Sequence, residues 1–256
     1  MGIKDFDIKK IAESGQAFRI TEEIPGIWRV IAENKVLRID SAAPQVPDSF
    51  WSNYFDLQTD YESYRRAIPA SDEFLTKAAE YGEGIRILRQ DPWEMLITFI
   101  ISQRKNIPAI KKSVEDICSR YGSPIPGEEG LHAFPSPKQL VQATESELRE
   151  CSLGYRVPYI MKASAMVCDG LLDLAAAAHL NDEELMEKLL EVPGVGPKVA
   201  NCVRLFGYHR IAAFPIDVWI ARVIEQQYSG DFPFELYDGF GGVIQQYMFY
   251  YGRTGI

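Results

Sequence analysis

The sequence has few cysteines, and none of them is arranged for a metal site. Cys118, Cys151, Cys168 and Cys202 lie far apart, without a C-x-x-C pair and without a neighbouring histidine at metal-ligand spacing. Scattered free cysteines are typical of proteins from a reducing compartment. We therefore expect neither a structural zinc nor an iron–sulfur cluster.

Signals for membrane insertion or export are also lacking. The longest strongly apolar stretch, Met95 to Ile101, is far too short to span a bilayer. Residues 1–15 lack the apolar core of a signal peptide and are too acidic for a transit peptide. These absences predict a soluble intracellular protein that does not bind membranes.

There is no excess of positive charge, since the chain has 36 aspartates and glutamates and 27 lysines and arginines, which give a net charge of −9. This balance argues against a protein that coats nucleic acid non-specifically, but it leaves room for a local basic face. What is present is the composition of an ordinary globular chain, with 46% hydrophobic, 12% aromatic and 25% charged residues. At 256 residues the chain can form one or two domains with a substantial core.

The chain begins with short aromatic and β-branched segments and continues with helical periodicity. The short aromatic and β-branched segments predict strands at 16–20, 27–32 and 35–40, separated by Pro25-Gly26 and Glu33-Asn34. An aromatic-rich helical pattern follows from residue 48. The remaining predicted helices are 71–81, 92–103, 106–121, 136–143, 145–151, 156–172, 182–191, 196–207, 217–228 and 240–251. We predict an α+β protein, with a small N-terminal antiparallel β-sheet domain (1–75, including helices) packed on a mainly α-helical region (76–256).

The run from Leu189 to Gly207, LLEVPGVGPKVANCVRLFG, predicts two helices joined by a tight hairpin. Pro197 opens the second helix, and Gly207 closes it. Gly194 and Gly196 permit positive φ and a close approach, so that backbone N–H groups of the hairpin and of the second helix can face a phosphate. A plain helical turn is the alternative, but two glycines alternating with proline and valine favour contact with DNA.

Lys198 lies in the first turn of that second helix, on the same face as Cys202. An ammonium beside a helix N-terminus is electrostatically disfavoured, and a neutral amine there can act as a nucleophile. A solvated lysine that contacts phosphate is the commoner alternative. The segment FPIDVW (214–219) favours chemistry, because Asp217 can be either an ordinary N-cap or a carboxylate that stabilises positive charge on a sugar.

A helix-hairpin-helix with a lysine, followed by a Pro-x-Asp loop, resembles the helix-hairpin-helix base-excision DNA glycosylases. Within that superfamily nearly the full length of the chain is similar to the 8-oxoguanine DNA glycosylase/lyases of the long type. Their N-terminal sheet is present, and the cysteines of the iron–sulfur endonuclease III branch are missing after Asp217. The segments that carry the likeness are SGQAFR (14–19), RILRQDPWEMLITFIISQRKNI (86–107), FPSPKQL (134–140), LGYR (153–156), VPGVGPKVANC (192–202), FPIDVW (214–219) and GGVIQQYMF (241–249).

The resemblance implies two catalytic residues. Lys198 is expected to attack C1′ of the damaged nucleotide, to expel the base, and to form a Schiff base that permits strand cleavage by β-elimination. Asp217 is expected to stabilise the oxocarbenium-like transition state and to act in the later steps.

It also implies the residues that bind the base. Gly15 corresponds to the glycine whose carbonyl accepts the N7–H that 8-oxoguanine has and guanine lacks. Phe249 and Cys202 correspond to the pair that sandwiches the flipped purine, and Gln245 to the amide that reads its Watson–Crick edge. Periodicity alone would slightly favour Phe249 as a core residue and Gln245 as a surface amide.

For the opposite strand the resemblance implies Tyr155 as a wedge beside the orphaned base and Arg156 as a contact to the orphaned cytosine. The sequence departs from the family at three positions. Arg104 stands where an asparagine usually fills the hole left by the flipped base, and Ala109 stands where a further cytosine-reading arginine is usual. Trp219 replaces a histidine that usually supports a phosphate. We therefore expect a relaxed preference for the base opposite the lesion.

Double-stranded DNA that contains oxidised guanine is the partner that the resemblance implies, with no metal or other cofactor. We expect a monomer that acts in the cytoplasm and nucleoid of a prokaryote or in the nucleus of a eukaryote. One alternative is a non-catalytic DNA-binding protein, in which Lys198 contacts phosphate and Asp217 only caps a helix. Another is a monofunctional glycosylase for alkylated purines, a group that keeps the aspartate and generally lacks the lysine.

Overall fold

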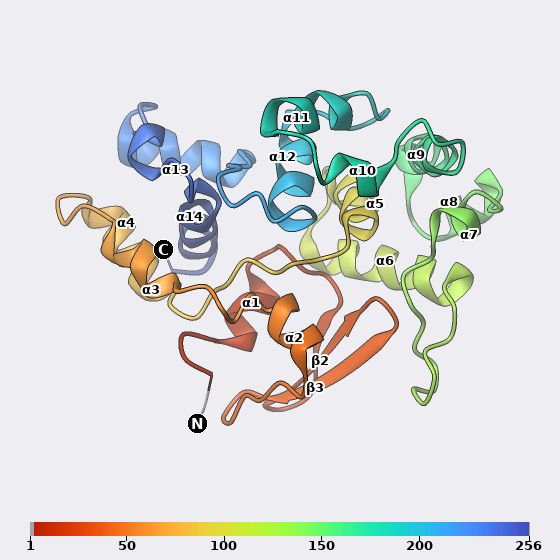
Figure 1. Cartoon of the computed structure of the whole chain (residues 1–256), viewed down its shortest axis with the longest axis horizontal. Helices are drawn as coiled ribbons and strands as arrows, with labels where there is room; N and C mark the ends of the chain where they lie inside the picture. The colour runs from red at the N-terminus through yellow and green to blue at the C-terminus, as the bar shows by residue number, and fades with distance from the viewer. Residues whose placement is uncertain (1–2, 256) are drawn as a thin grey trace.

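A computed structural model describes residues 3–255 of the chain and has a three-stranded antiparallel sheet at one side of the molecule (Figure 1). The sheet consists of β1 (Ile20–Ile24), β2 (Ile27–Ala32) and β3 (Lys35–Asp40), in that order. Pro25-Gly26 and Glu33-Asn34 form the two hairpin turns, as the sequence predicted. Gly26 has a φ of +85°, which glycine adopts without the steric cost that a Cβ would bring.

The first strand lies four residues further along the chain than predicted. It was expected at 16–20, but β1 starts at Ile20, which pairs with Val30. Only its first residue is buried, because β1 is an edge strand whose glutamates face solvent. The segment before it is apolar for another reason: it runs between the sheet and the helices. There the buried Gln16 side chain donates to the carbonyl of Arg86 and accepts from the N–H of Leu88, both at 2.9 Å.

Helices form most of the remaining chain, and several begin at the capping residues that the sequence indicated. Asp91 accepts a hydrogen bond from the N–H of Glu94 and Pro92 follows it, so that α5 begins as expected. The helices are α1 (Ile8–Glu13), α2 (Ser49–Tyr54), α3 (Tyr61–Arg66), α4 (Glu73–Tyr81), α5 (Pro92–Ser102), α6 (Ile107–Tyr121), α7 (Pro137–Leu140), α8 (Glu145–Glu150), α9 (Val157–Cys168), α10 (Leu174–Ala177), α11 (Asp182–Leu190), α12 (Pro197–Phe206), α13 (Val218–Tyr228) and α14 (Gly241–Thr254), with 3₁₀ turns at Gly154–Arg156 and Phe234–Tyr237.

Two short helices, α1 and α10, were not predicted, and α9 ends earlier than the predicted 156–172. The chain leaves α9 at Asp169 and turns through Gly170, which has a φ of +73°. Short helices carry little periodicity of their own, since most of their stability comes from packing against the rest of the protein.

The apolar side chains form two adjoining cores. The larger core surrounds α5, in which every residue from Trp93 to Ile101 is buried. The smaller core lies between the sheet, α1 and α2. Arg19 joins the two bodies, because its guanidinium donates to Glu115 of α6 at 2.8 Å and to the carbonyl of His132 at 2.7 Å. The predicted α+β architecture, a small sheet packed on a mainly helical body, is confirmed.

The stretch from Met95 to Ile101 is thus the interior of a core helix. Within residues 3–255 no helix is long and apolar enough to cross a membrane.

Candidate active site

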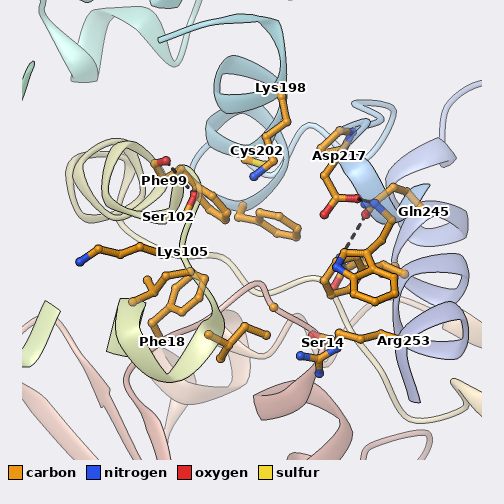
Figure 2. Close-up of a pocket in the computed structure, with 18 of the residues that line it drawn as sticks. Ser14, Phe18, Phe99, Ser102, Lys105, Lys198, Cys202, Asp217, Gln245 and Arg253 are labelled. Carbon is orange, nitrogen blue, oxygen red and sulfur yellow. Dashed lines mark hydrogen bonds between the residues drawn. The ribbon is translucent and has the colours of Figure 1, made fainter. Parts of the chain in front are cut away.

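A cavity of about 270 Å³, here called the pocket, lies where α12, α13 and α14 meet the segment that follows α1 (Figure 2). Residues from both ends of the chain therefore line one site. Seven residues that the sequence singled out line it: Gly15, Lys198, Cys202, Asp217, Trp219, Gln245 and Phe249.

The helix-hairpin-helix is present, with α11 and α12 joined by a tight turn. Gly194 has a φ of +86°, and a Cβ there would lie 2.4 Å from Cγ of Tyr159, so that only glycine fits. Gly196 has an ordinary φ of −104° and does not use the positive φ that glycine permits. Within residues 3–255, apart from its own chain neighbours, no atom lies within 4 Å of the position that its Cβ would take, and no side chain caps α12. The first N–H groups of α12 are therefore open to an anion.

Lys198 enters the pocket from the first turn of α12. Its Nζ lies 5.2 Å from the centre of the Phe99 ring, an apolar neighbour on α5. Among residues 3–255 it forms no ion pair. The amine is thus held near the pocket surface without a carboxylate that would neutralise it.

Asp217 both caps α13 and lines the pocket. Its Oδ1 accepts hydrogen bonds from the N–H groups of Trp219 and Ile220, each at 2.9 Å. Asp217 can therefore cap the helix and at the same time present a carboxylate to a sugar. The cap holds the carboxylate in the lining of the pocket (Figure 2), and among the described residues only its Oδ1 accepts hydrogen bonds, which leaves Oδ2 for another role.

Cys202 and Phe249 face the pocket from α12 and α14. Burial raises the pKa of the Cys202 thiol, and the nearby Lys198 opposes that rise only in part. The sulfur is therefore a neutral, polarisable surface at neutral pH. Gly15 has a φ of +75°, and a Cβ there would lie 2.9 Å from the ring of Phe249. A glycine is thus required both by the backbone and by the aromatic ring.

Gln245 is buried in the pocket wall rather than exposed as a surface amide. Its Oε1 accepts from Nε2 of Gln246 at 3.1 Å, and Oε1 of Gln246 accepts from Nε2 of Gln16 at 3.3 Å. These three buried amides connect the segment that follows α1 to the pocket. They leave the Nε2 of Gln245 able to donate to a molecule in the pocket.

Arg104, Ala109, Tyr155 and Arg156 do not line the pocket. They lie on two segments that we call the loop surface: residues 103–109, which include the first turn of α6, and residues 152–156, which include a 3₁₀ turn. Arg104 is exposed and has a φ of +53°, and Tyr155 is 49% exposed. Arg156 is only 5% exposed. Its guanidinium donates to the carbonyls of Leu153 and Gln103 and lies 4.4 Å from the Tyr155 ring centre.

The loop surface is tied to the hairpin. Nε2 of Gln103 donates to the carbonyl of Gly194 at 2.9 Å, while its own carbonyl accepts from Arg156. Nζ of Lys105 donates to the carbonyl of Ser152 at 2.6 Å. The hairpin and both loops are thus held at one end of the molecule as a connected surface.

Several residues of the site carry little or no signal in the sequence. Phe99, beside Lys198, gave no signal beyond its place in an apolar run. Arg253, which also lines the pocket, had one: it continues the stripe of Gln245 and Phe249 at a spacing of four on α14. Within residues 3–255, no cluster of three or more His, Cys, Asp or Glu side chains could hold a metal ion.

Comparison with known proteins places these observations among DNA repair enzymes. Residues 1–96 match the family model of the 8-oxoguanine DNA glycosylase N-terminal domain, and residues 97–231 match that of the HhH-GPD superfamily base excision DNA repair proteins. A probable N-glycosylase/DNA lyase of Methanothermobacter thermautotrophicus is 30% identical over 98% of this chain and 95% of its own. An N-glycosylase/DNA lyase of Saccharomyces cerevisiae is 38% identical over 57% of this chain, which spans 43% of that longer protein.

A solved structure is also similar over almost the whole chain. It is that of the Clostridium acetobutylicum 8-oxoguanine glycosylase/lyase, in complex with double-stranded DNA containing cytosine opposite 8-oxoguanine. The two are 34% identical, with a TM-score of 0.91 over 98% of this chain and 93% of the other.

Proposed function

The chain belongs to the HhH-GPD superfamily of base excision DNA repair proteins, and from this we propose that it is a bifunctional glycosylase and lyase that removes 8-oxoguanine from double-stranded DNA. One observation carries the proposal. Lys198 and Asp217, a nucleophile and a carboxylate, line the same pocket as Gly15, Cys202, Gln245 and Phe249.

DNA binding begins with the phosphate backbone. The uncapped N-terminus of α12 and the open backbone at Gly196 offer N–H groups and a helix dipole to a phosphate. Arg104 adds an exposed cation that forms no ion pair within the described chain. A small basic face of this kind lets an acidic protein bind DNA without coating it.

The target base then leaves the stack and enters the pocket, while Tyr155 fills space beside the orphaned base. The purine stacks between the Cys202 sulfur and the Phe249 ring. The carbonyl of Gly15 accepts the N7–H of 8-oxoguanine. Guanine would place an acceptor against that carbonyl, at a cost of about 1–3 kcal/mol for the unsatisfied pair.

In the chemical step Nζ of Lys198 attacks C1′ with its lone pair, and the C1′–N9 bond breaks as the base leaves with the electron pair of that bond. The carboxylate of Asp217 stabilises the positive charge that develops on the sugar. The C1′–O4′ bond then breaks as a proton passes from nitrogen to O4′, which gives a Schiff base between C1′ and Nζ. Loss of a proton from C2′ expels the 3′ phosphate by β-elimination.

Borohydride trapping on a duplex with one 8-oxoguanine tests the proposal. The protein should form a covalent adduct and cleave the strand, whereas Lys198→Gln should bind the duplex and form none. Lys77→Gln, which changes an exposed lysine on α4, is the matched control and should trap normally. Base excision without an adduct would support the monofunctional alternative, and binding without excision the non-catalytic one.

All the residues assigned to this reaction come from one chain, so a monomer suffices for it. The enzyme would act where the genome lies, in the nucleoid of a prokaryote or in the nucleus of a eukaryote.

A further inference from the structure

Arg253 lies in the last turn of α14, at the end of the pocket beside Ser14 (Figure 2). It is half-buried, and it stands four residues after Phe249 on the same face of the helix. None of the roles described above uses it.

Its guanidinium contacts two different parts of the chain at the edge of the pocket. One amino group, Nη2, donates to the carbonyl of Glu13, the last residue of α1. The guanidinium carbon lies 5.5 Å from the centre of the Phe249 ring. Its Nε is buried and has no hydrogen-bond partner among the described residues. Arg253 thus joins the ring that would stack on the base to the segment that ends in Gly15.

The segment needs such an anchor. A helix of six residues, as α1 is, has little stability of its own, and its last carbonyls lack partners within the helix. A cation at a helix C-terminus satisfies a carbonyl and interacts favourably with the dipole. Glu13 is held a second time, since its carboxylate accepts from the Tyr250 hydroxyl at 3.4 Å.

Gly15 follows two residues later and touches the same aromatic ring. Because a Cβ at Gly15 would already lie 2.9 Å from Phe249, the gap between this backbone and the ring is narrow. A shift of either partner would change where a stacked purine presents its N7 to the Gly15 carbonyl.

We propose that Arg253 is a positioning residue for recognition of the oxidised base, which sets the gap between the Gly15 carbonyl and the Phe249 ring. The inference rests on the proposed function. It predicts that Arg253 matters for excision of a base and not for the reaction of Lys198 with a sugar that has already lost its base.

The test compares Arg253→Gln with the unmodified protein on two substrates under single-turnover conditions. On a duplex with 8-oxoguanine, excision should fall at least tenfold. On the same duplex with a preformed abasic site, strand cleavage should stay within twofold. Arg253→Lys, which keeps a charged donor for the Glu13 carbonyl, should recover excision to within about threefold of the unmodified protein, and Lys77→Gln should change neither activity.

Equal losses on both substrates, or no loss on either, would overturn the proposal. So would an Arg253→Lys protein as defective as Arg253→Gln. Thermal unfolding of each variant separates a loss of fold from a loss of positioning. Failure of the proposed function would instead appear in the unmodified protein, which would then excise no 8-oxoguanine.

Discussion

The pocket and the loop surface face the same DNA in the proposed function, yet the protein holds them differently. The pocket residues Lys198, Cys202, Gln245 and Phe249 project from α12 and α14, whose other faces are buried in the main core. The loop surface is held by side chains that donate to backbone carbonyls, with the exposed Arg104 at its tip.

The two regions also differ in how far their residues follow the family pattern. The pocket departs from the family pattern at Trp219 and keeps the expected residue at its six other singled-out positions, whereas the loop surface departs at Arg104 and Ala109. The matching pocket residues are those to which the proposed function assigns the chemistry and the contacts to the base, whereas Arg104 and Ala109 would face the opposite strand. From this difference we predict strict recognition of the lesion and relaxed recognition of the base opposite it.

Asp217→Asn should have the largest effect in the pocket. Asparagine caps helices about as well as aspartate, so the start of α13 should be kept, but the negative charge beside the sugar is lost. We expect single-turnover excision to fall by about 10²–10³, as for other groups that stabilise a transition-state charge, with little change in the melting temperature. Asp217→Ala is the control and should also lose about 1 kcal/mol of stability with the cap. Full activity of the asparagine variant would show that Asp217 only caps α13 and that its charge has no catalytic role.

Gly15→Ala should have the next largest effect. The new methyl group meets both a left-handed backbone, which costs about 1–2 kcal/mol, and the Phe249 ring. If this strain is relieved by moving the Gly15 carbonyl, excision of 8-oxoguanine should fall by roughly five- to thirtyfold on the 1.4 kcal/mol per tenfold scale. Cleavage of a preformed abasic site should change little, since it needs no base in the pocket. A variant that excises 8-oxoguanine normally would show that the pocket is less tightly built than the structure indicates.

The loop surface predicts a weak opposite-base preference, because Ala109 offers no side-chain donor. Excision of 8-oxoguanine from four duplexes that differ only in the opposite base should vary by less than about a hundredfold. Ala109→Arg should raise the preference for cytosine by roughly tenfold, the value of one good polar contact of about 1–3 kcal/mol. A stronger preference in the unmodified protein would mean that Arg104 or Arg156 supplies the missing contact.

Arg104→Asn should have the smallest effect, and it should be a gain. Asparagine adopts the left-handed backbone conformation of this residue, with φ near +53°, more readily than arginine does. We expect the free energy of unfolding to rise by about 0.5–1 kcal/mol, or the melting temperature by about 2 °C. Arg104→Ala keeps the backbone penalty and should show no such gain. Equal stability of the two variants would contradict this account of the strain.

Much of the fold was predictable because its signals are local. Asp91, Pro92 and Asp217 mark helix starts through their own hydrogen bonds and ring geometry, and the two hairpin turns follow from their residues. The first strand was misplaced because a buried segment has the same apolar pattern whether it is a strand of the sheet or a stretch that packs between the sheet and the helices. Its true position, β1, is an exposed edge that carries mostly polar residues.

By itself, then, the sequence determined most of the longer helices, the hairpin between α11 and α12, and the residue types available for chemistry, since these depend on neighbours a few positions apart. Only the tertiary structure decided that Gly15 touches Phe249 from the other end of the chain, that Arg253 anchors α1, and that Arg156 is buried beneath Tyr155. Such contacts arise when apolar faces are buried together. Burial is non-directional, so no pattern along the chain states which faces will meet.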